Sequence, residues 1–383
     1  MSQTLVDLEK RHGDLYVPTF TIKVNGQDLL HDLYMEISSV TVDDTLKGAD
    51  RFSFVVNSAF DFEHHELRPD TEVSSVPTAQ REPRKFPFIT DLFAFGTGVE
   101  IRMGYQVDKP LPLMIRGKIT AVQTSFPASG LPQITVSGYD LSYCMTKGKK
   151  SRNWTNETDS NVVSKIGTKE YGLTANVKDT RVKHPKTKQS QESDWQFIEK
   201  LADRNGYEIH VFDQELSFAP PANDKAAILS LEWGSGLLSF SPEINIAEQI
   251  SKVEVRGWDV NTKKEIVGTA SAGEEPGRDP KGRSGAEVVK AVCRDQGDLK
   301  VRIPVFSQQE AKQRAAAILK KRSELFVQGS GESIGLPEIR AHTNIELKGM
   351  GKPFDKTYYV EQSTHTVNSS GYRTTFKVKD TTI

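Results

Sequence analysis

A serine between two glycines is the feature of this sequence that most resembles a catalytic motif. Residues 331–335 read GESIG, which matches the G-x-S-x-G consensus around Ser333. A nucleophile elbow needs a strand before the serine and a helix after it, because that turn exposes the hydroxyl. Here a predicted helix precedes the motif and Leu336–Pro337 follow it. A serine hydrolase centred on Ser333 is therefore only an alternative function.

Metal-ligating residue types gather in DFEHHE, residues 61–66. Neighbouring His64 and His65 diverge in a strand or a helix, and the H-E-x-x-H spacing does not occur. A solvated loop cluster is the better interpretation. His365, on a predicted strand, is expected to be packed or hydrogen-bonded rather than to act as a base. We predict no catalytic, cofactor-binding or metal-binding residue, no cofactor, and no enzyme activity.

Other ligand signals are weak. The sequence has no Walker loop, and GTGVEI lacks the third glycine of the dinucleotide fingerprint. The basic run KGKKSR, residues 147–152, is most simply a wet linker, and Trp195 with Phe197 are expected to pack a helix. Charged residues make up 26% of the chain and the net charge is −1. This balance gives no support for a nucleic-acid partner, which would need a basic excess.

Cys144 and Cys293 are the only cysteines, too few for a disulfide framework or a four-cysteine zinc site. The N-terminus lacks the apolar core of a signal peptide. No stretch approaches the ~18–20 apolar residues of a membrane span. We expect a chain that is cytoplasmic on synthesis and has no membrane anchor.

The elements that would hold these residues are mainly strands. A chain of 383 residues suggests two to four domains, at roughly 100–200 residues per domain. Alternating strand patterns fill residues 1–146, as in IRGKITAV, where one face is buried and the other wet. A proline-rich insertion at 58–96 interrupts them. A loop of that length is usually functional or ordered by a partner.

Residues 147–220 predict a small α+β module. One helix ends at Gly172; the next begins at a capping box of Ser193 and Gln196 and ends at Gly206. Between these helices, KDTRVKHPKTKQSQE is interpreted as a polar, basic connector. Two strands follow, around a turn at Asp213–Gln214.

Strand patterns return over residues 221–383, with one long helix at 307–327. Ser307 and Glu310 predict its capping box. AGEEPGRDPKGRSGAE, residues 272–287, is expected to be an exposed loop, and the part of it from Glu274 to Arg283 is a candidate for ordering by a partner.

Both strand regions close in the same way. GVEIRMGY (98–105) and NIELKGMG (344–351) are each followed by a Pro-containing break, a long strand, a Gly-containing turn and a last strand. Upstream, residues 37–56 and 250–269 also share a hairpin layout. Either any two β meanders look alike, or one barrel-like domain occurs twice. A duplicated unit lets three chains form a pseudo-sixfold ring. The predicted fold is mixed and mainly β, with two related β-barrel-like tube domains flanking a small α+β module.

Several separated motifs resemble those of phage late control D proteins, which share them with the hub half of VgrG spikes. ESDWQFIEKLADRNGYEI (192–209) matches the family's E-S-D-x-x-F signature. VSGYDLSYCMTKGKKSRNW (136–154) resembles its link out of the first barrel. GKPFDKTYYVEQSTHTVNSSGYRTTFKV (351–378) resembles its closing motif. The resemblance spans roughly residue 99 to the C-terminus.

This resemblance implies a structural baseplate hub of a contractile injection machine, such as a phage tail. Family members form a homotrimer, a symmetry adaptor between a hexameric inner tube and a trimeric central spike. Because residue 383 follows soon after the second barrel, a separate spike protein is expected, with other baseplate components as further partners. The resemblance also implies that strands at 113–123 and 357–366 line or flank the channel. A carbohydrate-binding β module is a second alternative, against which the lack of clustered aromatics argues.

Overall fold

The computed structural model describes residues 2–13, 15–57, 89–105, 110–259, 262–275, 278 and 281–383. The DFEHHE stretch and most of the 58–96 insertion lie outside these residues. In the described part of the chain, no helix has the length and apolarity that crossing a bilayer requires.

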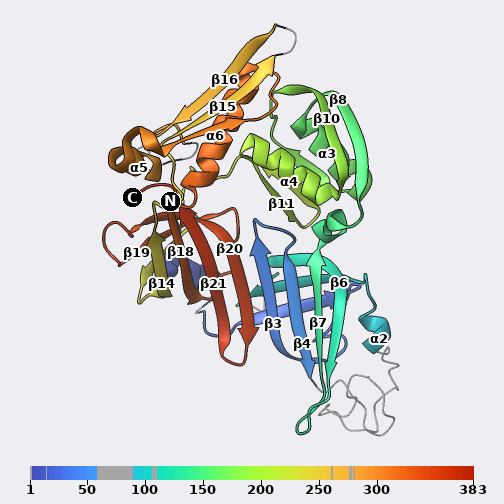
Figure 1. Ribbon diagram of the computed structural model, residues 1–383. Coiled ribbons are helices and arrows are strands. Elements are labelled where there is room, and N and C mark those ends of the chain that lie inside the picture. Colours follow the sequence, from blue (N-terminus) through green and yellow to red (C-terminus); the bar gives the residue numbers. More distant parts are fainter. Residues whose placement is uncertain are drawn as a thin grey trace, which may run out of the picture.

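One 13-stranded sheet runs through the lower half of the molecule in Figure 1, in the order β19-β13-β14-β18-β21-β20-β3-β4-β7-β6-β5-β1-β2. This confirms the predicted mainly β fold. The first half of the sheet contains β1 (Thr19–Val24), β2 (Gln27–Asp28), β3 (Glu36–Thr45), β4 (Arg51–Asn57), β5 (Gly98–Gly104), β6 (Leu113–Ser125) and β7 (Gln133–Asp140), and helix α2 (Ile89–Leu92) packs against it. Helix α1 (Leu5–His12) packs against the second half, where Leu8 joins the core. The second half contains β13 (Leu229–Trp233), β14 (Gly236–Ile244), β18 (Val327–Ile334), β19 (Asn344–Lys348), β20 (Lys356–Asn368) and β21 (Gly371–Asp380).

The two halves repeat one five-stranded arrangement. The order β3-β4-β7-β6-β5 matches β14-β18-β21-β20-β19, and every neighbouring pair in both is antiparallel. The register breaks also correspond: β3 shifts at Ile37/Ser39 and β14 at Leu237/Ser239. In the second half, β19 also pairs with β13, which closes a ring of six strands.

The upstream part of the sequence comparison was wrong. Residues 250–269 do not correspond to β3 and β4, because they belong to a separate sheet. The equivalents of β3 and β4 are β14 and β18, which residues 245–326 separate in the chain. A hairpin pattern in sequence indicates alternation but does not say which strand lies beside it.

Each half buries one face of its strands. In β7, Ile134 and Val136 join the first core while Thr135 and Ser137 lie on the opposite face. In β21, Phe376 and Val378 join the second core while Thr375 and Lys377 are exposed. The period of two therefore separates an apolar face from a polar one along the sheet.

The α+β module covers the upper end of the first half-sheet in Figure 1. Both helix ends match the prediction, since Ser193 and Gln196 form a full capping box and Gly172 and Gly206 are left-handed caps. Its elements are β8 (Lys150–Thr158), α3 (Asp159–Tyr171), β9 (Thr174–Val177), β10 (Lys183–Glu192), α4 (Asp194–Asn205), β11 (Glu208–Phe212) and β12 (Glu215–Ala219), after a 3-10 turn at Leu141–Thr146.

The predicted connector in this module is instead a strand. β10 pairs with β8 along its whole length. Its buried side chains are all polar, so the inward face carries no apolar signal: they are His184, Thr187, Gln189 and Glu192.

The remaining elements form a second module between β14 and β18. A sheet of β16 (Lys264–Ser271), β15 (Lys252–Asp259) and β17 (Asp298–Arg302) packs against α6 (Gln308–Ser323), with α5 (Gly285–Cys293) at one end. Gly268 allows this contact, because an added Cβ would lie 2.1 Å from the backbone of Ala311 in α6. Only one of the two hydrogen bonds of the capping box predicted for α6 is present. Ser307 accepts from the Glu310 N–H, but the Glu310 carboxylate accepts from Phe306 rather than from Ser307.

Candidate functional site

Ser333 lies in a strand, one residue before the strand ends. It is fully buried in β18, where it pairs with Leu237 on one side and Thr374 on the other. Its Oγ donates to the carbonyl of Ile334 at 2.8 Å. The flanking glycines serve packing, since a Cβ on Gly335 would lie 1.9 Å from a Tyr372 ring atom. The strand-turn-helix geometry of a nucleophile elbow is therefore absent at this motif.

His365 is a structural histidine, as expected. It is fully buried, with Nε2 2.9 Å from the Ile339 carbonyl and Nδ1 2.9 Å from the Tyr372 hydroxyl. Burial, helped by the positive charge of Arg340, lowers the pKa of His365 to about 3. A neutral, enclosed imidazole with fixed partners cannot exchange protons with a substrate.

The basic run at 147–152 is only partly a wet linker. Lys150 and Arg152 lie on β8 and contact the fully buried carboxylate of Asp194, at 2.7 and 3.1 Å. Trp195 and Phe197 are buried in the module core, as predicted.

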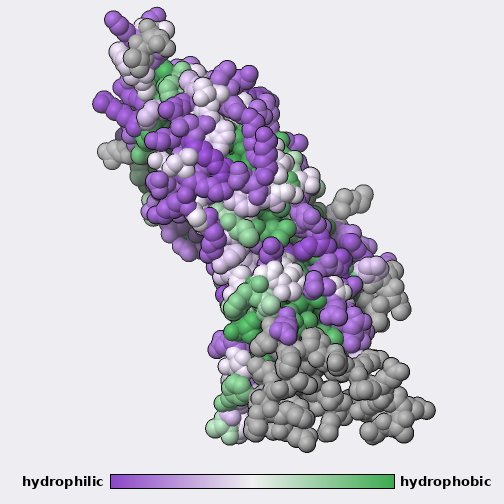
Figure 2. Space-filling view, turned by 90° about the vertical axis from the view of Figure 1, so that its right-hand side faces the viewer, coloured by the Kyte–Doolittle hydropathy of each residue, from purple (hydrophilic) through white to green (hydrophobic). Residues whose placement is uncertain are grey.

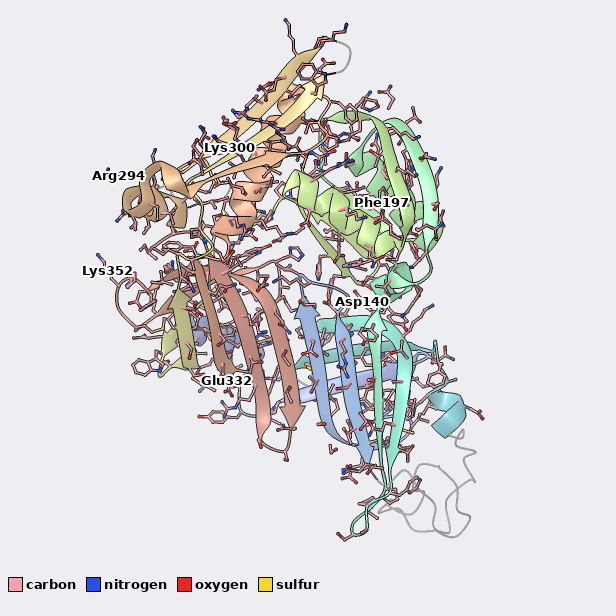
Figure 3. All side chains as sticks on the ribbon, viewed as in Figure 1. Asp140, Phe197, Arg294, Lys300, Glu332 and Lys352 are labelled. Carbon is pink, nitrogen blue, oxygen red and sulfur yellow. The ribbon has the colours of Figure 1, made fainter. Side chains whose placement is uncertain are left out.

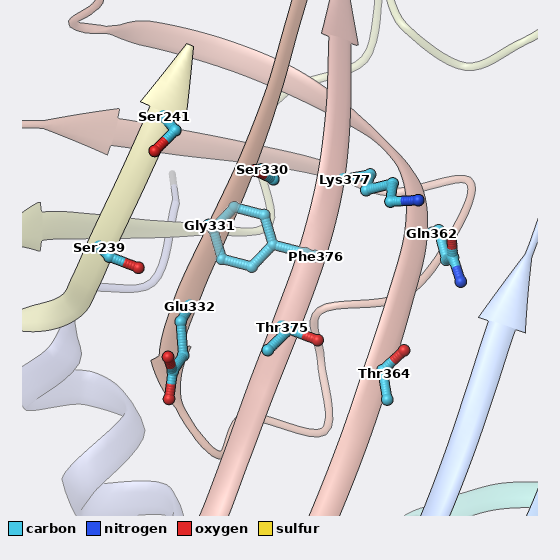
Figure 4. Close-up of a pocket in the computed structure, with 10 residues that line it drawn as sticks. All are labelled: Ser239, Ser241, Ser330, Gly331, Glu332, Gln362, Thr364, Thr375, Phe376 and Lys377. Carbon is cyan, nitrogen blue, oxygen red and sulfur yellow. The ribbon is translucent and has the colours of Figure 1, made fainter.

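The exposed face of the large sheet is rich in small hydroxyl side chains. Figure 4 shows a shallow hollow on this face, formed where β14, β18, β21 and β20 lie side by side. Ten residues line it: Ser239, Ser241, Ser330, Gly331, Glu332, Gln362, Thr364, Thr375, Phe376 and Lys377. The lining combines hydroxyl groups with one negative and one positive side chain. Its surface is therefore hydrated, and it does not gather several groups of one charge or one ligand type at a single point.

This polar face crosses the junction between the two halves of the sheet. Thr364 of β20 donates to the Asp43 carboxylate of β3 at 2.6 Å, and Thr366 lies 3.4 Å from Thr41. The face continues with Ser53 on β4 and with polar residues on β7. Eight neighbouring strands, β14-β18-β21-β20-β3-β4-β7-β6, therefore share one polar surface.

The two outermost strands of that surface have unpaired edges. β14 pairs with β13 only at Gly236 and Leu237, and among the described residues no strand flanks its outer edge beyond them. β6 pairs with β5 only as far as Lys118, which leaves Ala121 to Ser125 without a neighbour on that side in the described structure. These edges lie at opposite sides of the sheet in Figure 1. Exposed strand edges are templates for pairing with another chain.

A buried ionic network joins the second half-sheet to both modules. Lys379 of β21 contacts Glu208 of β11 at 3.1 Å and Glu324, just after α6, at 3.0 Å. His342 and Tyr359 also reach Glu208, at 3.3 and 2.6 Å. Burial alone would raise the pKa of Glu208, but the hydrogen bond with His342 and the positive charge of Lys379 outweigh burial and hold the pKa well below its usual range.

A second buried cluster joins the first half-sheet to β11. Asp44 and Asp50, at the β3–β4 hairpin, face His210, and Arg340 donates from the other side to Asp44. Burial would lower the pKa of His210, but the two carboxylates raise it to about 10. Burial and the charge of Asp50 raise the pKa of neighbouring Asp140 to about 8. Figure 3 labels Asp140 where the sheet meets the modules above.

Figure 2 shows one face on which hydrophilic residues cover most of the upper part and hydrophobic residues gather lower down. The predicted exposed loop at 272–287 is wrong at its C-terminal end, because Ser284 is the buried N-cap of α5 and residues 285 and 286 are buried in that helix. Buried Glu275 also accepts a hydrogen bond from Ser284.

The family model described as Alg8 N-terminal domain matches residues 82–369, three quarters of the chain. The chain belongs to the Alg8 N-terminal domain family. No curated protein matches this member of the family.

Solved structures show which fold this Alg8 N-terminal domain protein has. It is similar to the 43 kDa tail protein of prophage MuSo2 from Shewanella oneidensis, with 13% identity, a TM-score of 0.66, and coverage of 95% of this chain and 98% of that one. A tail protein from Neisseria meningitidis MC58 is 13% identical, with a TM-score of 0.65 and coverage of 95% of this chain and 97% of that one. The E. coli c3393 protein, a component of the type VI secretion system, is 10% identical, with a TM-score of 0.54 and coverage of 93% of this chain and 76% of that one. The chain thus shares the fold of these phage tail proteins and of this type VI secretion component.

Sequence reasoning missed both buried clusters of this Alg8 N-terminal domain protein. Their members come from elements far apart in the chain, and each lies singly in a strand or hairpin pattern. The one available signal was a charge at an inward position of a strand, as at Asp44 of β3, which follows the buried phase of Val40 and Val42.

Proposed function

We propose that this chain is the structural hub of a contractile injection machine and is close to the late control D family. Three copies form a homotrimer that joins a hexameric inner tube to a separate trimeric spike, beside other baseplate components. The chain works mechanically and has no catalytic role. It is part of an assembled tail or injection particle.

The observation that carries this proposal is the five-stranded unit that occurs twice and joins to itself. Within one chain, β20 pairs with β3 over Gln362–Asn368 and Ser39–Thr45. By strand order and register breaks, β6 is the equivalent of β20 and β14 is the equivalent of β3. The free edges of β6 and β14 are therefore the two strands that would repeat the β20–β3 junction between copies.

The register of that contact follows from the internal one. Thr364 opposite Asp43 in the chain corresponds to Gln123 opposite Glu243 between copies. Pro242 supplies no N–H, so the ladder between chains has one donor fewer than the internal ladder. Such a contact is heterologous, and with two equivalent units per chain, three chains close a pseudo-sixfold ring.

The polar face of the sheet supports the proposal that these strands form the channel wall of the ring. The strands predicted to line the channel, 113–123 and 357–366, lie entirely within β6 and β20. Their shared exposed face carries hydroxyls and amides such as Gln123, Gln362 and Thr364. A hydrated wall of hydroxyls and amides lets a passing chain slide without adhering. The tube domains are proposed at 1–146 and 221–383, with the α+β module at 147–220 outside the ring.

A cysteine pair tests the ring. In a Cys144→Ser/Cys293→Ser background, Gln123→Cys with Glu243→Cys should give a disulfide-linked trimer under mild oxidation, seen by non-reducing electrophoresis and native mass spectrometry. The matched control pairs Gln123→Cys with Lys377→Cys, which shares the polar face but lies away from the edge. Monomers alone, even after co-expression with tube and spike proteins, would refute the proposal.

A further inference from the structure

We propose that Asp44, Asp50 and His210 bind a divalent transition-metal ion, Zn²⁺, where the first half-sheet meets the α+β module. This site is independent of the proposed hub function. It uses two oxygen ligands and one imidazole, a set that suits zinc. Because Asp44 and Asp50 come from the β3–β4 hairpin and His210 from β11, the ion would fasten the module to the sheet.

The spacing of the three side chains suits a metal better than direct hydrogen bonds. His210 Nε2 lies 3.5 Å from Asp44 Oδ1 and 3.7 Å from Asp50 Oδ2, and one ligand atom of each residue lies within 4.8 Å of the others. Hydrogen bonds between such charged groups are normally about 2.7–2.9 Å long. Tetrahedral ligands held about 2.0–2.2 Å from zinc lie roughly 3.3–3.6 Å from one another.

Two of the candidate ligand atoms lack a hydrogen-bond partner. Asp44 Oδ1 and His210 Nε2 are both buried and unpaired, and the Asp44 side chain is 0% exposed. Buried polar atoms in folded proteins nearly always have a hydrogen-bond partner. Two such atoms that face each other without a partner therefore indicate that a bound group belongs between them. An ion between them would satisfy both atoms.

The other oxygen of each carboxylate is already held. Arg340 Nε donates to Asp44 Oδ2, and the Thr45 N–H donates to Asp50 Oδ1 at 2.9 Å. These contacts orient Asp44 Oδ1 and Asp50 Oδ2 toward the imidazole, as outer-sphere partners do in metal sites. The His210 side chain is 17% exposed, which gives an ion a path from solvent.

The alternative occupant is a proton. A protonated His210 between two carboxylates carries charge in the same place and would also hold the two parts together. Metal binding requires the neutral imidazole, so a zinc ion and this proton compete for Nε2.

The experiment uses the full chain with Cys144→Ser and Cys293→Ser, because both native cysteines are exposed and thiolates are zinc ligands that would compete with the proposed site. After chelator treatment and desalting, one equivalent of Zn²⁺ should stay with the protein through gel filtration, measured by elemental analysis. Co²⁺ should give d–d absorption bands of a nitrogen–oxygen site. His210→Gln should weaken binding at least tenfold and abolish the zinc-induced rise in Tm.

His31→Gln is the matched control, because His31 is an exposed histidine beside an aspartate, Asp28. It should bind zinc as the parent does. His210→Gln also avoids the folding problem of Asp44→Asn, which would leave Arg340 buried without its carboxylate. Failure of the folded parent chain to retain zinc, or equal retention by His210→Gln, would overturn the metal site and leave the proton bridge. Neither result would bear on the trimer.

Discussion

Replacing Lys379 with Met tests whether the buried ionic network holds the second half-sheet to the modules. Lys379 is only 10% exposed on its side chain, and it lies between the carboxylates of Glu208 and Glu324. The change keeps most of the apolar stem but leaves two buried anions with fewer cations.

The expected cost follows from what remains. Removing one partner of a buried ion pair costs about 3–5 kcal/mol when the other charge is left alone. Here Glu208 keeps His342 at 3.3 Å and Glu324 keeps Lys320 at 3.3 Å. We therefore expect about 2–3 kcal/mol, which lowers the Tm of the affected unit by about 5–10 °C.

The pH dependence has a definite sign. Because the pKa of Glu208 is held below its usual range, the stability it contributes is complete above about pH 4.3 and is lost as pH falls toward the folded-state pKa. The gap between wild type and Lys379→Met should be full at pH 7 and shrink below about pH 4. Adding Glu208→Gln to the variant should recover part of the loss at pH 7.

The assay combines calorimetry with hydrogen exchange at β11 and the end of α6, because a chain with several cores need not unfold in one step. Lys348→Met is the control, since that lysine is half exposed and 2.9 Å from Glu346, and its loss should cost less than about 1 kcal/mol. Equal effects of the two variants on Tm and on β11 exchange would refute the reasoning.

Three further predictions follow from packing and burial. Gly335→Ala should destabilise the second barrel by at least about 1–3 kcal/mol in urea unfolding, whereas Gly98→Ala, with open space around it, should not. Ser333→Ala should leave esterase and peptidase assays unchanged and cost about 1 kcal/mol of stability, and an activity lost with this hydroxyl would revive the hydrolase alternative. Asp194→Asn should cost about 2–4 kcal/mol at pH 7, because it leaves Lys150 without its buried carboxylate. The pKa of Asp194 is lowered, so that cost should fall as urea unfolding is repeated toward pH 3, and a constant cost would contradict it.

The sequence by itself determined the local structure. The capping box of Ser193 and Gln196, the left-handed caps at Gly172 and Gly206, and the alternation in β6 and β7 each depend on residues close together in the chain. The repeated closing meander was also readable, because turn chemistry and strand order persist where identity does not.

Only the tertiary structure decided which strands pair and which side chains far apart in the sequence come into contact. The buried face of β10 is polar. Its strand structure therefore depends on pairing with β8 and on hydrogen bonds such as the one that Gln189 donates to Asp194. The equivalence of β14 and β18 to β3 and β4 was hidden, because a whole module is inserted between them. Asp44 and His210 meet only when β11 packs over the β3–β4 hairpin. Burial and charge contact are properties of space, and a pattern along the chain does not contain them.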